Sequence, residues 1–172
     1  MYFACEELFR SINELFLAKP PRLLSAGILA RSLIEYYFWF FYFLKDPIQA
    51  EKDFDGNTKA NFNKFYKNCS KKDPSIEETF STIQEGETKV KGIAEKAGLL
   101  PQYKILYSSI SMYTHPSPFC IMLLKPKIEL AIGSFVIGAK CMTEMIESLG
   151  NVNSTTLNKL QADLEKLLSI IA

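Results

Sequence analysis

The chain contains one histidine, His115, and hydroxyl side chains precede it at helical spacing. Tyr107 and Ser111 come eight and four residues earlier, so the three side chains would stack along one side of an α-helix. Histidine has an unperturbed pKa near neutrality, which suits a general acid or base. The spacing therefore predicts a proton-transfer site at His115, with Tyr107, Ser111 and the neighbouring Ser108 binding a substrate.

A helical wheel of residues 103–115 gathers the polar and amphipathic side chains of this stretch in one arc. The arc consists of Tyr103, Lys104, Tyr107, Ser108, Ser111, Thr114 and His115. The apolar side would hold Ile105, Leu106, Ile110, Met112 and Tyr113. Because the arc has one lysine and no acid, we expect a semi-enclosed polar cleft rather than a solvated face. Two other interpretations stay open: the arc faces water, or His115 only ends the helix before Pro116.

A second polar pair, Arg31 and Glu35, lies in the middle of the most apolar segment, residues 23–44. Their i, i+4 spacing places them on one side of a helix. Because buried charges need partners, we expect this pair to meet the His115 arc across a helix interface. There Glu35 would orient His115 and Arg31 would steady a phosphate, which makes His115, Arg31 and Glu35 the candidate catalytic residues. A closed salt bridge that only orients the helices is the alternative.

The elements that position these residues are predicted to be helices, because helical periodicity is strong and alternating strand patterns are absent from the sequence. We expect helices at about 2–17, 21–44, 57–70, 75–97, 101–115, 127–149 and 154–171, with loops at 46–57 and 116–126. Gly98 is a candidate C-cap of the fourth helix. Residues 1–172 would form a single all-α domain, a bundle of six to seven helices.

Charge and composition restrict the partners of the chain. Twenty Lys and Arg against nineteen Asp and Glu give a formal charge of +1, so no overall field attracts nucleic acid or an anionic membrane. Arg31 and Glu35 would be costly in lipid, and Glu6 and Glu7 stand where a secretory signal needs positive charge. We expect a cytoplasmic protein without membrane contact.

The four cysteines are widely separated, and none belongs to a CxxC pair. Together with a single histidine they cannot supply a usual zinc ligand set. We interpret Cys5, Cys69, Cys120 and Cys141 as reduced, mostly buried thiols, and we expect neither a metal nor a cofactor.

The segments "RSLIE" (31–35) and "YSSISMYTHPS" (107–117) resemble a bacterial family of uncharacterised domains with RxxxE and YxxxSxxxH motifs. That family is similar to a divergent branch of the HEPN superfamily. The resemblance implies a small helical bundle that dimerises, acts in toxin–antitoxin or phage-defence systems, and cleaves RNA without metal. Active HEPN ribonucleases place an arginine four to six residues before the histidine. This chain has no arginine there, so only His115 carries over.

Three functions are compatible with these residues. The first is an HEPN-like effector that acts on RNA or a nucleotide, in which His115 transfers protons and Arg31 binds phosphate. The second is a non-catalytic module of the same fold that binds a ligand or a partner protein. The third, a Ser–His–Glu hydrolase with Ser111 as nucleophile, ranks last because the sequence lacks a GxSxG turn.

Two further patterns concern assembly and binding. Small residues form a strip along the helix at 127–149: Ala131, Ser134, Gly138 and Cys141. The strip favours close approach of another helix, either in a homodimer or within the chain against residues 21–44. A lysine stripe, Lys64, Lys67 and Lys71, could contact RNA but is more typical of a solvated face, and the nearby Phe62 and Phe65 are expected in the core.

Overall fold

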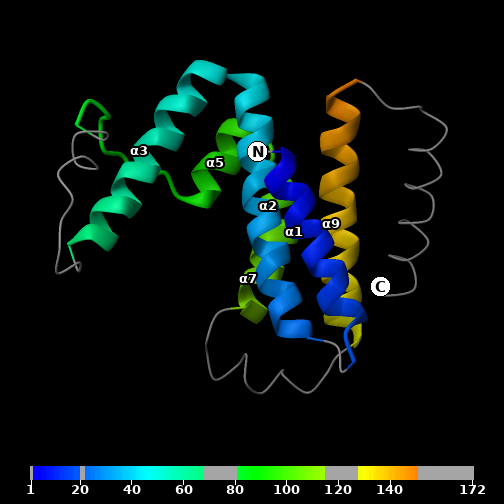
Figure 1. Ribbon diagram of the computed structural model, residues 1–172. Helices are drawn as coiled ribbons and strands as arrows, with labels where there is room; N and C mark the ends of the chain where they lie inside the picture. Colours follow the sequence, from blue (N-terminus) through cyan, green and yellow to red (C-terminus); the bar gives the residue numbers. More distant parts are fainter. Residues whose placement is uncertain (1, 20–21, 68–80, 115–127, 151–172) are drawn as a thin grey trace.

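Three long helices lie side by side and form the main body of the fold (Figure 1). They are α1 (Tyr2–Leu17), α2 (Leu23–Lys45) and α9 (Ile128–Ser148). The structure is a computed structural model and describes residues 2–19, 22–67, 81–114 and 128–150. Within these ranges all regular secondary structure is helical, which confirms the predicted all-α class and the helical bundle.

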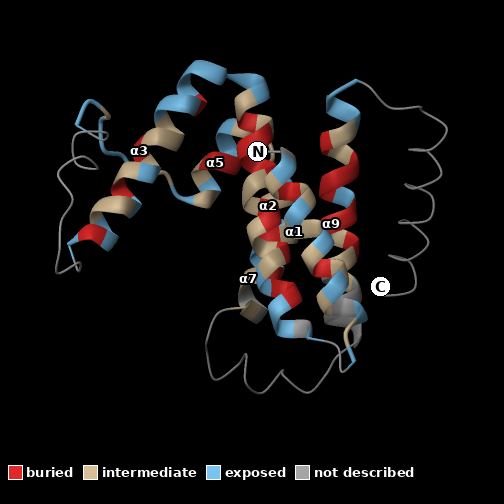
Figure 2. Ribbon diagram, in the orientation of Figure 1, coloured by how far each residue is buried: buried red, intermediate tan, exposed pale blue. Residues whose placement is uncertain are grey.

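The central helix is α2, because α1, α9, α3 (Pro47–Tyr66), α5 (Val90–Ala97) and α7 (Ser108–Thr114) all pack against it. Its buried residues include Leu33 and Phe38. The ribbon of Figure 2 is coloured red at the buried positions of α2. Full burial of such a side chain contributes about 1.5–3 kcal/mol. Gly138 lets α9 come close, since a Cβ atom there would lie 3.3 Å from the side chains of both Leu33 and Phe9.

A hydrogen bond between the buried phenol of Tyr37 and the half-buried carboxylate of Glu144 also joins α2 to α9. The Tyr37 hydroxyl donates a hydrogen bond to Glu144 Oε2, and burial together with this carboxylate raises the pKa of Tyr37. Cys5 and Cys141 lie in the same core as free, buried thiols, as predicted. Burial raises the pKa of Cys5 to about 11, which keeps this thiol protonated.

The stretch 46–57, predicted to be a loop, is helical and opens α3. The Asp46 side chain caps this helix by accepting a hydrogen bond from the Gln49 backbone N–H at 3.1 Å, and Pro47 occupies its first turn. Proline is favoured at that position because its missing N–H has no partner there. The Asp–Pro pair therefore starts a helix, and the prediction of a loop was wrong.

The long helix predicted between Ser75 and Ala97 is also wrong in part, because residues 81–89 are irregular and only α5 is helical. The Asn57 side chain of α3 pairs with both backbone groups of Thr88: it donates to the carbonyl at 3.2 Å and accepts from the N–H at 2.6 Å. These bonds satisfy the Thr88 backbone without a helix. The predicted C-cap is confirmed, since Gly98 has φ of 81°.

The helix predicted at 101–115 is confirmed to Thr114, but it contains a wider π-helical turn. It consists of α6 (Leu100–Gln102), the π-turn η1 (Tyr103–Tyr107) and α7. A π-turn advances each residue by a smaller angle than an α-turn. The helical wheel was therefore wrong about Ile105, which is 68% exposed, whereas Tyr107 from the polar arc is only 7% exposed.

The remaining predictions have mixed outcomes. The helix predicted at 127–149 corresponds to α9, whereas the loop at 116–126, the helix at 154–171, Cys69, Cys120 and Lys71 lie outside the described residues. Gly138 and Cys141 of the small-residue strip pack inside the chain, and the side chains of Ala131 and Ser134 are not described.

On α3, the prediction of a core position for Phe65 is wrong, since its side chain is 69% exposed. Phe62 instead packs its ring against Tyr66, with ring centroids 4.8 Å apart. None of the helices in the described ranges combines the length and apolarity needed to cross a membrane.

Candidate functional site

Arg31, Glu35 and Tyr107 form a polar cluster where α2 meets η1. Arg31 donates hydrogen bonds to the Tyr107 hydroxyl oxygen from Nε at 3.1 Å and from Nη2 at 2.9 Å. Tyr107 donates in turn to Glu35 Oε1 at 2.8 Å, and Arg31 Nε lies 3.4 Å from the same carboxylate oxygen. The structure thus brings together three of the six predicted site residues. We call them the Arg31–Glu35–Tyr107 cluster.

Burial and the Glu35 carboxylate keep Tyr107 a neutral donor. Burial, and then the hydrogen bond to the Glu35 carboxylate, raise the pKa of Tyr107 to about 12, while Arg31 works in the opposite direction. The Arg31 guanidinium carbon also lies 5.3 Å from the centroid of the Tyr107 ring, within cation–π range. The ion pair itself is only half-buried, with Arg31 28% and Glu35 36% exposed, which is less burial than the apolar sequence around it predicted.

The other predicted site residues are placed differently. Ser108 is exposed, and its hydroxyl donates to the Tyr103 carbonyl at 3.3 Å, one turn earlier. Ser111 is half-buried in α7, and its carbonyl accepts a hydrogen bond from Thr114. Within the described part of the chain, neither serine hydroxyl bonds to the Arg31–Glu35–Tyr107 cluster. His115 lies outside the described residues, so its place and its role stay predictions.

A cleft of about 660 Å³ opens beside the cluster, between α2, α3, the start of α5 and η1. Its walls include Glu35 and Tyr107 together with the aromatic side chains of Trp39, Phe54 and Tyr103. A smaller hollow of about 300 Å³ shares Glu35, Trp39 and Phe54 with the cleft, so these three residues border both spaces. We call the larger space the aromatic cleft.

The aromatic rings of the cleft support one another. Tyr103 and Tyr107 are stacked with centroids 5.3 Å apart, and Trp39 meets Phe54 edge-on at 5.2 Å. Such contacts fix rings in place and leave a firm apolar wall. Sequence reasoning missed this wall, because Phe54 was assigned to a loop. The i, i+3, i+4, i+7 set of Ser32, Glu35, Tyr36 and Trp39 was the available signal for a functional side of α2.

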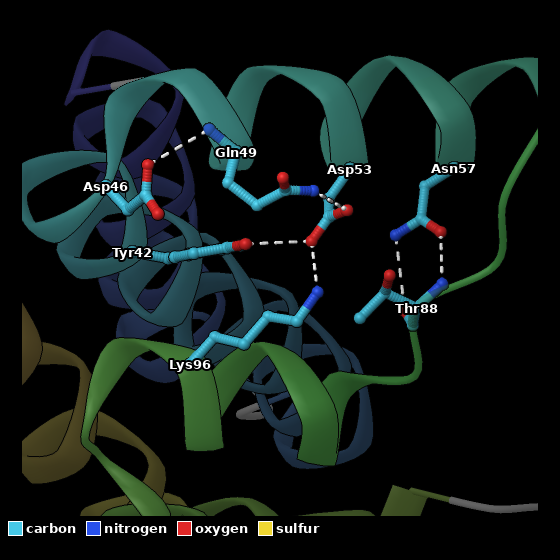
Figure 3. Close-up of polar contacts among 7 residues, drawn as sticks. All are labelled: Tyr42, Asp46, Gln49, Asp53, Asn57, Thr88 and Lys96. Carbon is cyan, nitrogen blue, oxygen red and sulfur yellow. Dashed lines mark hydrogen bonds and ion pairs between the residues drawn. The ribbon is translucent and has the colours of Figure 1, made fainter. Parts of the chain in front are cut away.

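A polar network fixes α3, which carries one wall of the cleft, against α2 and α5 (Figure 3). Asp53 accepts hydrogen bonds from the Tyr42 hydroxyl at 2.9 Å and from Gln49 Nε2 at 3.0 Å, and it forms an ion pair with Lys96. Partial burial alone would raise the pKa of Asp53, but hydrogen bonds from Lys96, Tyr42 and Gln49 lower it overall. The carboxylate therefore stays charged and holds the three helices together.

Residues 1–125 match the model of a family of unknown function, DUF5677. The chain belongs to this family. No curated protein and no solved structure matches the chain. The family region includes the Arg31–Glu35–Tyr107 cluster and the aromatic cleft, whereas α9 comes after it.

The described residues of the site in this DUF5677 protein offer hydrogen bonding, charge and stacking. Among the described residues, no group of three or more His, Cys, Asp or Glu could hold a metal ion. The guanidinium of Arg31 is engaged by the Tyr107 hydroxyl and lies beside the Glu35 carboxylate. What remains is a firm aromatic surface beside a carboxylate and a neutral phenol, which suits a planar ligand with polar edges.

Proposed function

We propose that this DUF5677 protein is an HEPN-like effector that acts on RNA or a nucleotide beside the Arg31–Glu35–Tyr107 cluster. The observation that carries the proposal is the contact between the RxxxE and YxxxSxxxH segments, in which Arg31 and Glu35 both bond to Tyr107. Two motifs that are far apart in sequence thereby supply one site, next to a cleft large enough for a nucleotide.

In this proposal His115 carries the proton transfer and Arg31 stabilises the phosphate. During metal-free RNA cleavage the ribose 2′-hydroxyl attacks the adjacent phosphorus, and neutral His115 takes its proton. The bond to the 5′-oxygen breaks, and that oxygen takes a proton from solvent, which leaves a 2′,3′-cyclic phosphate. Tyr107 and Ser111 position the RNA by hydrogen bonding, Ser108 contributes from the exposed rim, and Glu35 orients both Arg31 and His115.

The experiment is a cleavage assay with EDTA on single-stranded and structured RNA. We expect cleavage by the wild type and none by His115→Ala or Arg31→Ala. Arg10→Ala is the matched control, because Arg10 is an exposed arginine on α1 that pairs with Glu6 and lies apart from the cleft. No cleavage by the wild type, or equal cleavage by His115→Ala, would reject the proposed activity.

A second candidate, a non-catalytic module that binds a ligand or a partner protein, has one observation in its favour. Two nitrogens of Arg31 already donate to Tyr107, and Glu35 lies beside them, so the cluster neutralises its own charge. A site of this kind can recognise a ligand without stabilising a transition state. Ligand binding by a protein that cleaves no RNA would favour this candidate.

A further inference from the structure

The aromatic cleft combines three kinds of group that together specify a ligand. Trp39, Phe54 and Tyr103 provide flat apolar walls, Glu35 provides a carboxylate, and Lys89 and Lys91 provide positive charge. Aromatic walls favour a planar, stacking ligand. The question is therefore which planar ligand presents hydrogen-bond donors at one edge and negative charge at another.

The carboxylate end of the cleft favours a ligand with hydrogen-bond donors. Glu35 Oε1 already accepts from Tyr107 and lies beside Arg31, whereas no hydrogen bond from the described residues reaches Oε2. A ligand edge placed there has to donate, because an acceptor would meet the lone pairs of the carboxylate. A cationic ligand fits less well, since Arg31 already compensates the charge of Glu35 and two lysines line the same cleft.

The lysine end of the cleft favours an anionic group of the ligand. Lys89 and Lys91 are exposed, and within the described ranges neither forms an ion pair. The one other acid in the cleft wall, Glu87, is paired with Lys64 at 2.9 Å. Its carboxylate also interacts with Lys89, but this single acid offsets only part of the positive charge of the two lysines. Both lysines stand at the first turn of α5, where the helix dipole adds to the attraction for negative charge.

We propose that the aromatic cleft binds a guanine nucleotide, with the base against the aromatic wall, its edge on Glu35 and its phosphate at Lys89 and Lys91. Guanine is the base that presents two adjacent donors, N1–H and the N2 amino group, and a carboxylate accepts both. Adenine and cytosine place a ring acceptor next to their amino group, and uracil has a single N–H between two carbonyls. This inference deepens the proposed function. The role of the bound nucleotide as a substrate rests on that function, whereas the binding of the nucleotide does not.

The chain carries its own reporter, because Trp39 is its single tryptophan and lines the cleft. Titration of the full chain with GMP is expected to quench tryptophan fluorescence at concentrations about 5- to 150-fold lower than AMP requires, because a bidentate pair discriminates between bases by about 1–3 kcal/mol. Glu35→Gln should abolish the preference for GMP over AMP. Lys89→Ala with Lys91→Ala should weaken GMP but leave guanosine unchanged.

Controls separate this inference from instability and from the proposed activity. Lys52→Ala, an exposed lysine of α3 that borders a different hollow, should bind GMP like the wild type. Circular dichroism verifies the fold of each variant; if Glu35→Gln is unfolded, the AMP and GMP comparison on the wild type decides. The same titration with guanine-containing and guanine-free oligoribonucleotides, compared with GMP, shows whether the cleft binds a guanine residue of RNA or a free nucleotide.

Two results would overturn the inference: equal quenching by GMP and AMP, or no quenching by either GMP or guanine-containing RNA at millimolar concentration. GMP binding without RNA cleavage would reject only the proposed ribonuclease activity. Cleavage without preference for guanine would reject only the assignment of the base. The two proposals therefore fail separately.

Discussion

Replacing Tyr107 by phenylalanine removes one oxygen atom and three polar contacts of the Arg31–Glu35–Tyr107 cluster. The hydroxyl accepts from two Arg31 nitrogens and donates to Glu35. A hydrogen bond to a charged group contributes about 1.5–3 kcal/mol. The side chains of Arg31 and Glu35 are 28% and 36% exposed, and Arg31 Nε lies 3.4 Å from Glu35 Oε1. Water and the attraction between the two charges therefore replace part of the lost hydrogen-bond energy. We expect Tyr107→Phe to lower the free energy of unfolding by about 1–2 kcal/mol.

Urea unfolding and thermal melting measure this change, and the melting temperature should fall by about 2–8 °C in a chain of this length. Tyr103→Phe is the matched control. Tyr103 lies in the same π-turn and stacks on Tyr107, but its hydroxyl makes no hydrogen bond within the described residues. Its loss should change the free energy of unfolding by less than about 0.5 kcal/mol.

The alkaline pH range supplies a second signature of the same contacts. Burial and the Glu35 carboxylate raise the pKa of Tyr107 to about 12, against about 10 for an ordinary tyrosine. Between these values the folded chain keeps a proton that the unfolded chain has lost, so stability falls as the pH rises. Tyr107→Phe should lack this part of the decline, and Tyr103→Phe should retain it. Equal stability and identical alkaline profiles of the two variants would refute the reasoning.

Two other predictions follow from the contacts of α3. The lowered pKa of Asp53 stabilises the fold above the ordinary carboxyl pKa of about 4, and this contribution is lost as the pH falls through the folded-state pKa. In acid titrations Asp53→Asn should therefore lose stability less steeply than the wild type. Equal slopes of the two proteins would contradict this prediction. Gly56→Ala places a Cβ atom 3.1 Å from the Gln84 carbonyl oxygen and the Gly86 nitrogen, so we expect about 1 kcal/mol of destabilisation in urea unfolding. Gly92→Ala in α5 meets only a methyl group at 3.4 Å and should stabilise by about 0.5–1 kcal/mol, and the opposite order of these two variants would count against the close approach.

The sequence predicted those elements whose own residues determine them. Helices α1, α2 and α9 have long apolar patterns, and their bounds agree with the prediction within a few residues. Residues 81–89 could not be predicted in the same way, because the bonds from Asn57 to Thr88 come from a helix more than twenty residues earlier. The local hydrophobic periodicity of residues 81–89 gives no information about a contact with a distant helix. The π-turn at Tyr103–Tyr107 was likewise missed, because the helical wheel assumed a constant rotation per residue.

The same division applies to the candidate site. The meeting of Arg31, Glu35 and Tyr107 followed from one physical rule, that polar groups within apolar helices need partners. The aromatic cleft did not follow from any rule applied to one segment. Lys89 lies beside Thr88, which is bonded to Asn57 of α3, and Phe54 reaches the cleft through the direction in which α3 leaves α2. That direction depends on the Asp46 cap and on the Asp53 network, which are tertiary features.

The pairing of Tyr37 with Glu144 implies that the family region and the folding unit have different boundaries. The match to DUF5677 ends at residue 125, yet α9 contributes Val136 and Met145 to the interior and accepts the hydroxyl hydrogen of a buried tyrosine. A protein truncated at residue 125 would expose one side of α2 to water and leave the Tyr37 hydroxyl without this acceptor. Expression of the family region by itself is therefore expected to yield aggregated material, and recombinant fragments should extend at least through Ser148.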